Sequence, residues 1–358
     1  MRKGLIAAVM PLLLAVAVLP ARAVDKTPAD RAIDRALAYL QRQQDADGAW
    51  RGGPGNAKNP AITSLCVMAF LAAGHVPGEG RYGTTVEKGI GWVLKEQRPN
   101  GLIASQGGHE MYHHGIATLM LAEVSGMTGA QQGEEVRKKL EKAVALILKA
   151  QRTTPGSHHG GWRYHLDPRQ DYPPSDISVT GWQVMALRAA KNLGCDIPAE
   201  RIDWAVAYVQ RCYDPASGGF RYYPGSRVTI GCTGTSILAL ELCGKERHRS
   251  TEALKAGAYL IKRPPYWGQE HFFYSVYYCS QATFQLGGNY WSFFKPQLYK
   301  MLLNNQLSDG SWLGRDGSSR IYGRNYCSAM AVLALAVEYR FLPIYQRGEE
   351  PAEEGGRD

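Results

Sequence analysis

The residues best suited to chemistry are tyrosines, histidines and arginines that lie just before, or at the start of, long apolar segments. Tyrosine and histidine can exchange protons or present a ring face to a ligand, and arginine can pair with an anionic group. One carboxylate, Asp176, lies in the same kind of position. The candidate ligand-binding residues are Tyr112, His113, His114, Tyr164, His165, Asp176, His271, Tyr274, Tyr278, Arg320, Arg324 and Tyr326.

In one interpretation, these side chains form a polar and aromatic pocket. The rings would accept the carbon face of a lipid, an isoprenoid or a glycan, and Arg320 and Arg324 would pair with an anionic head group. An enzyme that uses Tyr and His as acid and base is a variant of this interpretation. No pair of residues is singled out for that chemistry, so the catalytic residues are unknown.

Two other interpretations stay open. His113 or His114 could join His158, His159 or His165 around a metal ion, but no two of these histidines have the i, i+4 spacing that places ligands on one helix face. Alternatively, the rings simply fill the core and cap helices. The sequence requires no cofactor and does not identify one, so the cofactor is left as unknown. We assign no metal ligand.

The helices that would position these residues are indicated by a sequence motif that recurs six times. A helix ends in Gln, a Gly-rich turn follows, and an aromatic residue closes the turn before an apolar helix. Self-similarity of this kind indicates a repeat architecture. The copies, some of them degenerate, begin at Gln44, Gln97, Gln151, Gln210, Arg263 and Gln306.

Each unit contains two helices of different character. The first has one apolar stripe, as in Ile33, Ala36, Leu37 and Leu40, which is typical of an outer helix. The second helix has apolar or small residues on nearly all of its faces, so it should be buried on most sides. An open chain of such hairpins would leave the inner faces in water, so closure is favoured. The second helices are expected at 62–73, 115–124, 179–190, 231–242, 274–286 and 326–337.

These motifs resemble a known superfamily. The segments 44–50 and 306–312 resemble the QW motif of squalene cyclases, and 50–56 and 218–225 resemble glycine-rich turns of protein prenyltransferase β-subunits. The resemblance covers about residues 30–340. It implies an all-α fold, an α/α toroid (α6/α6 barrel) of six helical hairpins, in which each Gln braces its outer helix against the next unit's aromatic. It also implies that the candidate residues line one mouth of a central cavity.

The catalytic motifs of that superfamily are missing. In the cyclases that the sequence resembles, an Asp-x-Asp-Asp-Thr motif supplies the catalytic acid. Asp176 and Thr180 match the first and last positions of this motif, whereas Ser178 and Val179 replace the paired carboxylates. A serine is too weak an acid to protonate an alkene, so Asp176 is expected to be a helix N-cap.

The other two chemistries fail in the same way. At the prenyltransferase zinc positions the chain has His271 and Phe273, with Tyr326 where the later histidine would be. Cys232 and Cys327 lack the neighbours of the thioester motif found in complement-like relatives.

The two ends of the sequence differ from its body. Residues 1–23 combine Arg2 and Lys3, a short apolar run and a small-x-small site at Ala21-Arg22-Ala23, which predicts a cleaved signal peptide. Residues 24–346 form the toroid domain, and 347–358 form an acidic tail predicted to be disordered. We expect a periplasmic or secreted protein with no transmembrane span after cleavage.

The remaining expectations concern partners. The formal net charge of +9 favours anionic partners only weakly, and no motif predicts nucleic-acid binding. The seven cysteines are an odd number, so disulfides could not pair them all within one chain. Together, the residues predict a protein that binds a lipid, isoprenoid or glycan in its cavity. The alternatives are a divergent terpenoid-type or carbohydrate-active enzyme that uses cavity Tyr, His and Asp, and a scaffold that binds a protein partner.

Overall fold

The computed structural model describes residues 25–105, 109–243 and 248–346, which form twelve α-helices joined by turns and short 3₁₀ segments. The predicted signal peptide (1–23) and acidic tail (347–358) lie outside the described residues. Within the described part of the chain, no helix combines the length and the apolar composition needed to cross a membrane.

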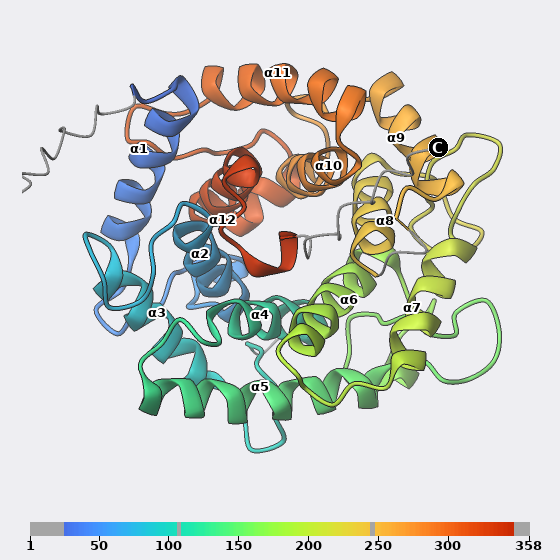
Figure 1. The fold of residues 1–358 in the computed structure, drawn as a ribbon, viewed down its shortest axis with the longest axis horizontal. Helices are drawn as coiled ribbons and strands as arrows, with labels where there is room; N and C mark the ends of the chain where they lie inside the picture. The colour runs from blue at the N-terminus through green and yellow to red at the C-terminus, as the bar shows by residue number, and fades with distance from the viewer. Residues whose placement is uncertain (1–24, 106–108, 244–247, 347–358) are drawn as a thin grey trace, which may run out of the picture.

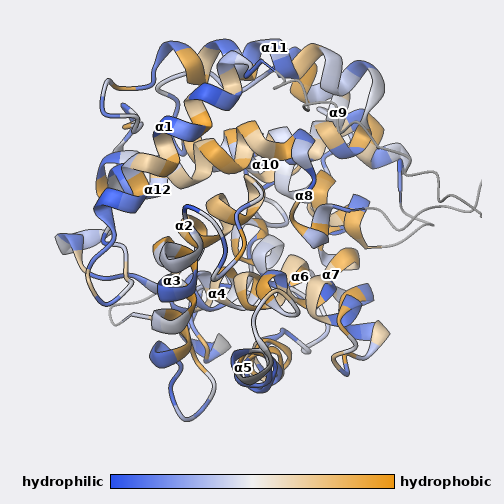
Figure 2. Cartoon of the chain, turned by 60° about the vertical axis from the view of Figure 1, so that its left-hand side comes forward, coloured by the Kyte–Doolittle hydropathy of each residue, from blue (hydrophilic) through white to orange (hydrophobic). Residues whose placement is uncertain are grey.

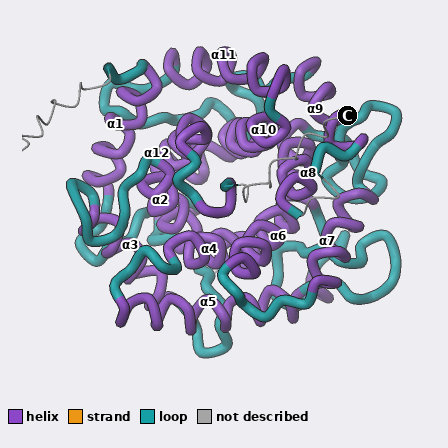
Figure 3. Tube along the Cα trace, viewed as in Figure 1, coloured by secondary structure: helices purple, strands orange, loops and turns teal. Residues whose placement is uncertain are grey.

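The helices form two concentric rings, as Figures 1 and 3 show. The outer ring contains α1 (Pro28–Gln43), α3 (Gly83–Glu96), α5 (Ala130–Ala150), α7 (Ala199–Arg211), α9 (Thr251–Lys262) and α11 (Gly288–Asn304). The inner ring contains α2 (Pro60–Ala72), α4 (Glu110–Val124), α6 (Ile177–Asn192), α8 (Ile230–Leu242), α10 (Phe272–Leu286) and α12 (Gly317–Leu335). The inner ring closes where α12 packs against α2. The predicted toroid of six hairpins is therefore confirmed.

The two rings bury their residues in the way the apolar patterns predict. Helix α1 buries one stripe that includes Ile33, Leu37 and Leu40, whereas every residue of α2 is buried. Figure 2 shows the same contrast, because the inner helices are mostly hydrophobic and the outer helices alternate between hydrophobic and hydrophilic patches. Burial of apolar surface between the rings is thus the main stabilising contribution.

Helix α12 begins earlier than its apolar pattern suggests. The pattern starts at residue 326, but the helix starts at Gly317 and is broken at Gly323, whose φ is 83°. Residues 317–325 are mostly polar and lie near the surface, so no apolar periodicity marks this first part of the helix. The break at Gly323 turns this polar part relative to the buried part.

The repeated Gln holds neighbouring units together. The side-chain amide of Gln44 donates to the carbonyl of Gly48 in its own turn at 3.0 Å and to that of Thr85 in the next outer helix at 2.9 Å. Gln97 and Gln151 make the same pair of bonds to their own turns and to α5 and α7. The partner of the Gln is therefore the backbone of the next outer helix, and not the next unit's aromatic residue as the resemblance had implied.

The last unit uses this brace to close the outer ring. Gln306 donates to Gly310 at 2.9 Å and to Ala32 of α1 at 2.8 Å. The turn glycine fits against the next helix too, because a Cβ on Gly310 would lie 2.4 Å from the carbonyl oxygen of Arg35. The aromatic residue instead braces its own outer helix, since the indole N–H of Trp312 donates to the Leu302 carbonyl at 2.8 Å.

The C-terminal segment closes one end of the inner ring, which the sequence did not predict. We call the 3₁₀ turn Pro343–Tyr345 the C-terminal plug. The Ile344 N–H donates to both carboxyl oxygens of Glu123 at 3.3 Å, and Gln285 donates to the Tyr345 carbonyl at 3.2 Å. Glu123 and Gln285 lie at the C-terminal ends of α4 and α10, so the plug fills the end opposite the inner-helix N-termini.

Candidate functional site

Asp176 marks the start of the inner helix α6, at the unplugged end of the toroid. One oxygen, Oδ1, accepts from the backbone N–H of Val179 at 2.9 Å and from the Ser178 hydroxyl at 2.6 Å. The side chain is completely buried. The prediction that Asp176 is an N-cap is therefore confirmed, and the cap fixes the orientation of the carboxyl group.

The second oxygen of Asp176 is less well satisfied. Oδ2 has no hydrogen-bond partner among the described residues, although Nη1 of Arg163 lies 3.4 Å away. That Nη1 is itself buried and lacks a hydrogen bond to any described residue. Burial raises the pKa of Asp176 to about 6, while the bonds from Ser178 and Val179 and the charge of Arg163 oppose the rise. The carboxyl group can therefore gain or lose a proton near neutral pH.

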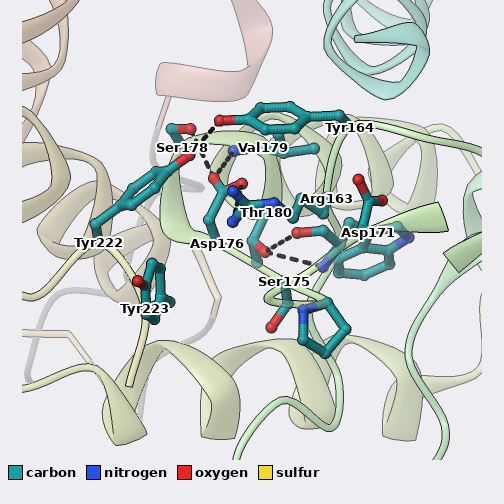
Figure 4. A network of polar contacts seen from close by, with 12 residues as sticks. Arg163, Tyr164, Asp171, Ser175, Asp176, Ser178, Val179, Thr180, Tyr222 and Tyr223 are labelled. Carbon is teal, nitrogen blue, oxygen red and sulfur yellow. Dashed lines mark hydrogen bonds and ion pairs between the residues drawn. The ribbon is translucent and has the colours of Figure 1, made fainter. Parts of the chain in front are cut away.

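Tyr112, Tyr164, Tyr222 and Tyr274 lie near this carboxyl group, and Tyr278 packs on Tyr274; we call these five residues the tyrosine cluster. The rings of Tyr112 and Tyr164 stack with centroids 6.1 Å apart, and those of Tyr274 and Tyr278 lie 4.7 Å apart. The hydroxyls of Tyr164 and Tyr222 are hydrogen-bonded to each other. Figure 4 shows Tyr164 and Tyr222 extending over Asp176 from opposite sides.

The cluster combines a cation, neutral phenols and a titratable acid. The guanidinium of Arg163 lies 4.6 Å from the ring centroid of Tyr164 and 5.6 Å from that of Tyr222, within the range of a cation–π interaction. Burial raises the pKa of the Tyr112 and Tyr274 phenols well above 10, so both keep their protons at neutral pH. Such a site can offer ring faces, hydroxyl groups and one proton donor or acceptor to a ligand.

Aromatic packing continues from the tyrosine cluster into the centre of the toroid. The indole of Trp182 stacks on Tyr277 at 5.6 Å and meets Tyr278 edge-on at 5.3 Å. Tyr277 is hydrogen-bonded to Tyr345 of the C-terminal plug. The Tyr278 hydroxyl is buried and has no hydrogen-bond partner among the described residues. One layer of rings therefore separates the tyrosine cluster from the plug.

The predicted histidines do not join this cluster. The His114 ring accepts from the Ile103 N–H at 3.2 Å through Nδ1, and its Nε2 lies 3.0 Å from the Ala143 carbonyl of α5. Burial lowers the pKa of both His113 and His114 to about 4, so both are neutral at pH 7. His114 thus contacts the outer ring.

The other predicted residues make local contacts around the mouth. His165 pairs with Asp171 at 2.9 Å, and Nδ1 of the exposed His271 lies 2.8 Å from the Ser318 hydroxyl. Arg324 pairs with Asp309 at 3.0 Å. Tyr326 packs on Tyr322 at 5.2 Å, and Arg320 is exposed. Of the twelve predicted residues, the structure brings together Tyr112, Tyr164, Asp176, Tyr274 and Tyr278.

Two residues of the site were absent from the prediction, namely Arg163 and Tyr222. The repeat itself contained the signal, because the turn Trp162-Arg163-Tyr164 is matched one unit later by Phe220-Arg221-Tyr222. Aligning the two turns would have placed Tyr222 beside Tyr164. The contact of Arg163 with Asp176 has no such signal, since the matching Arg221 pairs with Asp214 instead.

The geometry gives no support to a thiol site or a metal site among the described residues. Cys66, Cys232, Cys279 and Cys327 are buried, and burial raises the pKa of each thiol, which keeps them protonated. Among the described residues, no three His, Cys, Asp or Glu side chains lie close enough together to hold a metal ion.

Comparisons with known proteins place the chain in a structural context. The family model described as the prenyltransferase alpha-alpha toroid domain matches residues 7–160 and 169–341. No curated protein matches the sequence. The apo structure of the type II terpene cyclase MstE from Scytonema is similar with a TM-score of 0.60 at 16% identity, covering 88% of this chain and 99% of that chain.

A second solved structure has a different activity. The α-1,6-mannanase of Salegentibacter sp. HEL1_6 is similar with a TM-score of 0.61 at 14% identity, covering 87% of this chain and 98% of that chain. One variant of the cyclase was solved with geranylgeranyl dihydroxybenzoate, and an inactive variant of the mannanase was solved with α-1,6-mannotriose. At these identities the likeness shows the fold alone, since one fold can support unrelated functions.

Proposed function

Because this chain belongs to the prenyltransferase α/α-toroid family, we propose that it is an exported toroid protein that binds an organic ligand at the tyrosine cluster. The ligand belongs to the lipid, isoprenoid or glycan class. The observation that carries this proposal is the pair of buried atoms, Asp176 Oδ2 and Arg163 Nη1, that lack hydrogen bonds to any described residue. Buried polar groups are normally hydrogen-bonded, so this pair needs an explanation, and a bound ligand would supply the missing partners.

The chemistry of the site limits the ligand. The ring of Tyr112 suits the C–H face of a sugar or an isoprenoid chain, whereas the ring of Tyr164 is already stacked on His109 at 4.3 Å and lies 4.6 Å from the Arg163 guanidinium. Asp176 Oδ2 can accept a hydrogen bond when it is ionised, and Arg163 can donate one, so the site suits a ligand that carries a hydroxyl or carbonyl group. Two structurally similar proteins carry a lipid-like and a glycan ligand, which supports these classes without choosing between them.

Catalysis by Asp176 is the second candidate function. A pKa of about 6 lets this carboxyl act as a general acid or base near neutral pH. Ser178, which replaces one of the paired carboxylates of cyclases, donates its hydroxyl to Asp176 and supplies no acid of its own. We therefore propose acid–base chemistry on a substrate less demanding than an alkene.

Native mass spectrometry of the mature protein, purified from its own cell envelope, tests binding directly. We expect a discrete excess mass that disappears on denaturation. The matched variants are Tyr112→Ala and Tyr299→Ala, because Tyr299 is a partly buried tyrosine of α11 outside the cluster. Tyr112→Ala should lose the excess mass and Tyr299→Ala should keep it. A bare chain mass for the wild-type protein would contradict the proposal and favour a protein-binding scaffold.

A further inference from the structure

The seam between the first and last units contains a pocket that is separate from the tyrosine cluster. It has a volume of about 390 Å³, within the range of roughly 300–1,000 Å³ that is usual for ligand sites. One wall comes from the end of α1 and the turn after it, and the other from the start of α12. We call it the seam pocket. Apart from Tyr39 and Gly323, every residue that lines it has a polar or charged side chain.

Three arginines converge on the seam pocket, two from the first unit and one from the last. Arg42 donates to the Asp309 carbonyl at 3.0 Å, Arg324 pairs with the Asp309 carboxylate at 3.0 Å, and Arg51 pairs with Asp45 at 2.9 Å. Each of these bonds uses one guanidinium nitrogen, and the described residues offer no hydrogen bond to the others. The remaining N–H groups can bind a carboxylate, as arginine forks commonly do.

The pocket also contains two buried acceptors that receive no hydrogen bond from the described residues, namely Asp45 Oδ2, which is ion-paired with Arg51, and Asn325 Oδ1. Asn325 is only 9% exposed, and its Nδ2 donates to the Arg51 carbonyl at 3.0 Å. Its Oδ1 has no hydrogen-bond partner among the described residues. An oxygen in this position needs a hydrogen-bond donor, which a sulfate ion lacks at neutral pH and a sugar hydroxyl supplies. A ligand that carries both an anionic group and hydroxyl groups would satisfy the arginines and Asn325 together.

We propose that the seam pocket binds an acidic sugar unit of a glycan. Its carboxylate pairs with the guanidinium groups of Arg42, Arg51 and Arg324, and one of its hydroxyls donates to Asn325 Oδ1. The nearly complete polar lining excludes the apolar body of a lipid. The site bridges units one and six, so its ligand stabilises the closed ring by binding the folded state.

The proposal is tested by calorimetric titration of the full chain with trigalacturonate at low salt, with maltotriose and inorganic sulfate as comparison ligands. We expect saturable binding of trigalacturonate, and much weaker binding of the other two. Arg42→Gln and Arg324→Gln should each weaken the binding by about tenfold, as expected for the loss of a charge-assisted bond. Asn325→Leu should weaken the binding of trigalacturonate and leave that of sulfate unchanged.

The control is Arg137→Gln, since Arg137 is an exposed arginine paired with Glu141 on α5, away from the seam. It should bind trigalacturonate as the wild-type protein does. Thermal melts of each variant show whether it is folded, and Arg42, an exposed residue of an outer helix, is the variant least prone to disturb the fold. Absence of saturable trigalacturonate binding, equal binding by the seam variants, or equal binding of sulfate would overturn the proposal.

Discussion

The toroid has a buried carboxyl group at each end, and the two differ in the helix terminus and the charge that lie beside them. Asp176 precedes the first turn of α6 and receives bonds from Val179 and Ser178, with Arg163 nearby. Glu123 is the second-to-last residue of α4, and among the described residues its carboxyl accepts hydrogen bonds only from the Ile344 N–H. Burial raises the pKa of Asp176 to about 6 and that of Glu123 to about 8.

The difference follows from helix polarity and from the nearby charge. A helix N-terminus and an arginine favour a carboxylate, whereas a helix C-terminus disfavours it. Asp176 can therefore change its protonation state within the tyrosine cluster near neutral pH. Glu123 is protonated at neutral pH and serves to hold the C-terminal plug. The open end of the toroid is thus suited to chemistry, and the closed end is suited to stability.

The largest expected effect comes from Asp176→Ala. This change removes the N-cap of α6 and leaves the Arg163 guanidinium buried without its partner, so it should lower the free energy of unfolding by about 4 kcal/mol. Urea denaturation measures this loss. Asp176→Asn is the matched control, because asparagine keeps the cap and should lose less. Equal stability of wild-type and Asp176→Ala proteins would show that the cap and the ion pair contribute nothing.

The pH dependence of stability should come mainly from Glu123. Its pKa in the folded protein is above its ordinary value of 4.5, so folding is favoured by the protonated form. The stabilisation is complete below about pH 4.5 and is lost as the pH rises through about 8, by a few kcal/mol. Urea titrations between pH 5 and pH 8 measure it. Glu123→Gln should flatten the curve over this range, and an unchanged slope in this variant would rule out Glu123 as the source.

Removing one hydroxyl from the plug should have a smaller effect. Tyr345→Phe breaks the buried hydrogen bond with Tyr277 and should lower the free energy of unfolding by about 1 kcal/mol. Because a layer of rings separates this hydroxyl from the tyrosine cluster, ligand occupancy in native mass spectra should stay the same. A loss of ligand in this variant would mean that the ligand reaches the plug.

Tyr164→Phe should have the smallest effect on stability and the clearest effect on binding. The side chain is only partly buried, so loss of its bond to Tyr222 should lower the free energy of unfolding by about 0.5 kcal/mol. Ligand occupancy should fall, because the hydroxyl helps to define the polar part of the site. The same native mass measurement checks this, and full occupancy in Tyr164→Phe would place the ligand elsewhere.

Much of the fold was predictable because it depends on local patterns that repeat. The Gln and Gly of each turn and the contrast between striped and uniformly apolar helices led to six hairpins in a closed ring. The site was only half predictable. Tyr112 and Tyr274 were found from their positions before inner helices, whereas Tyr222 required an alignment of two turns. His114 was placed at the right helix start, but its position on that helix directs its ring toward α5.

The sequence by itself determined the positions of the helices apart from the polar start of α12, the order of the units and the N-cap role of Asp176, because hydrogen bonding and apolar periodicity act over a few residues. Only the tertiary structure decided which groups meet: Arg163 with Asp176, the plug with Glu123, and Arg42 with Asp309 across the seam. These contacts join residues up to hundreds of positions apart, and they depend on how the ring closes. Burial at those contacts then sets the pKa of each carboxyl, which no local pattern specifies.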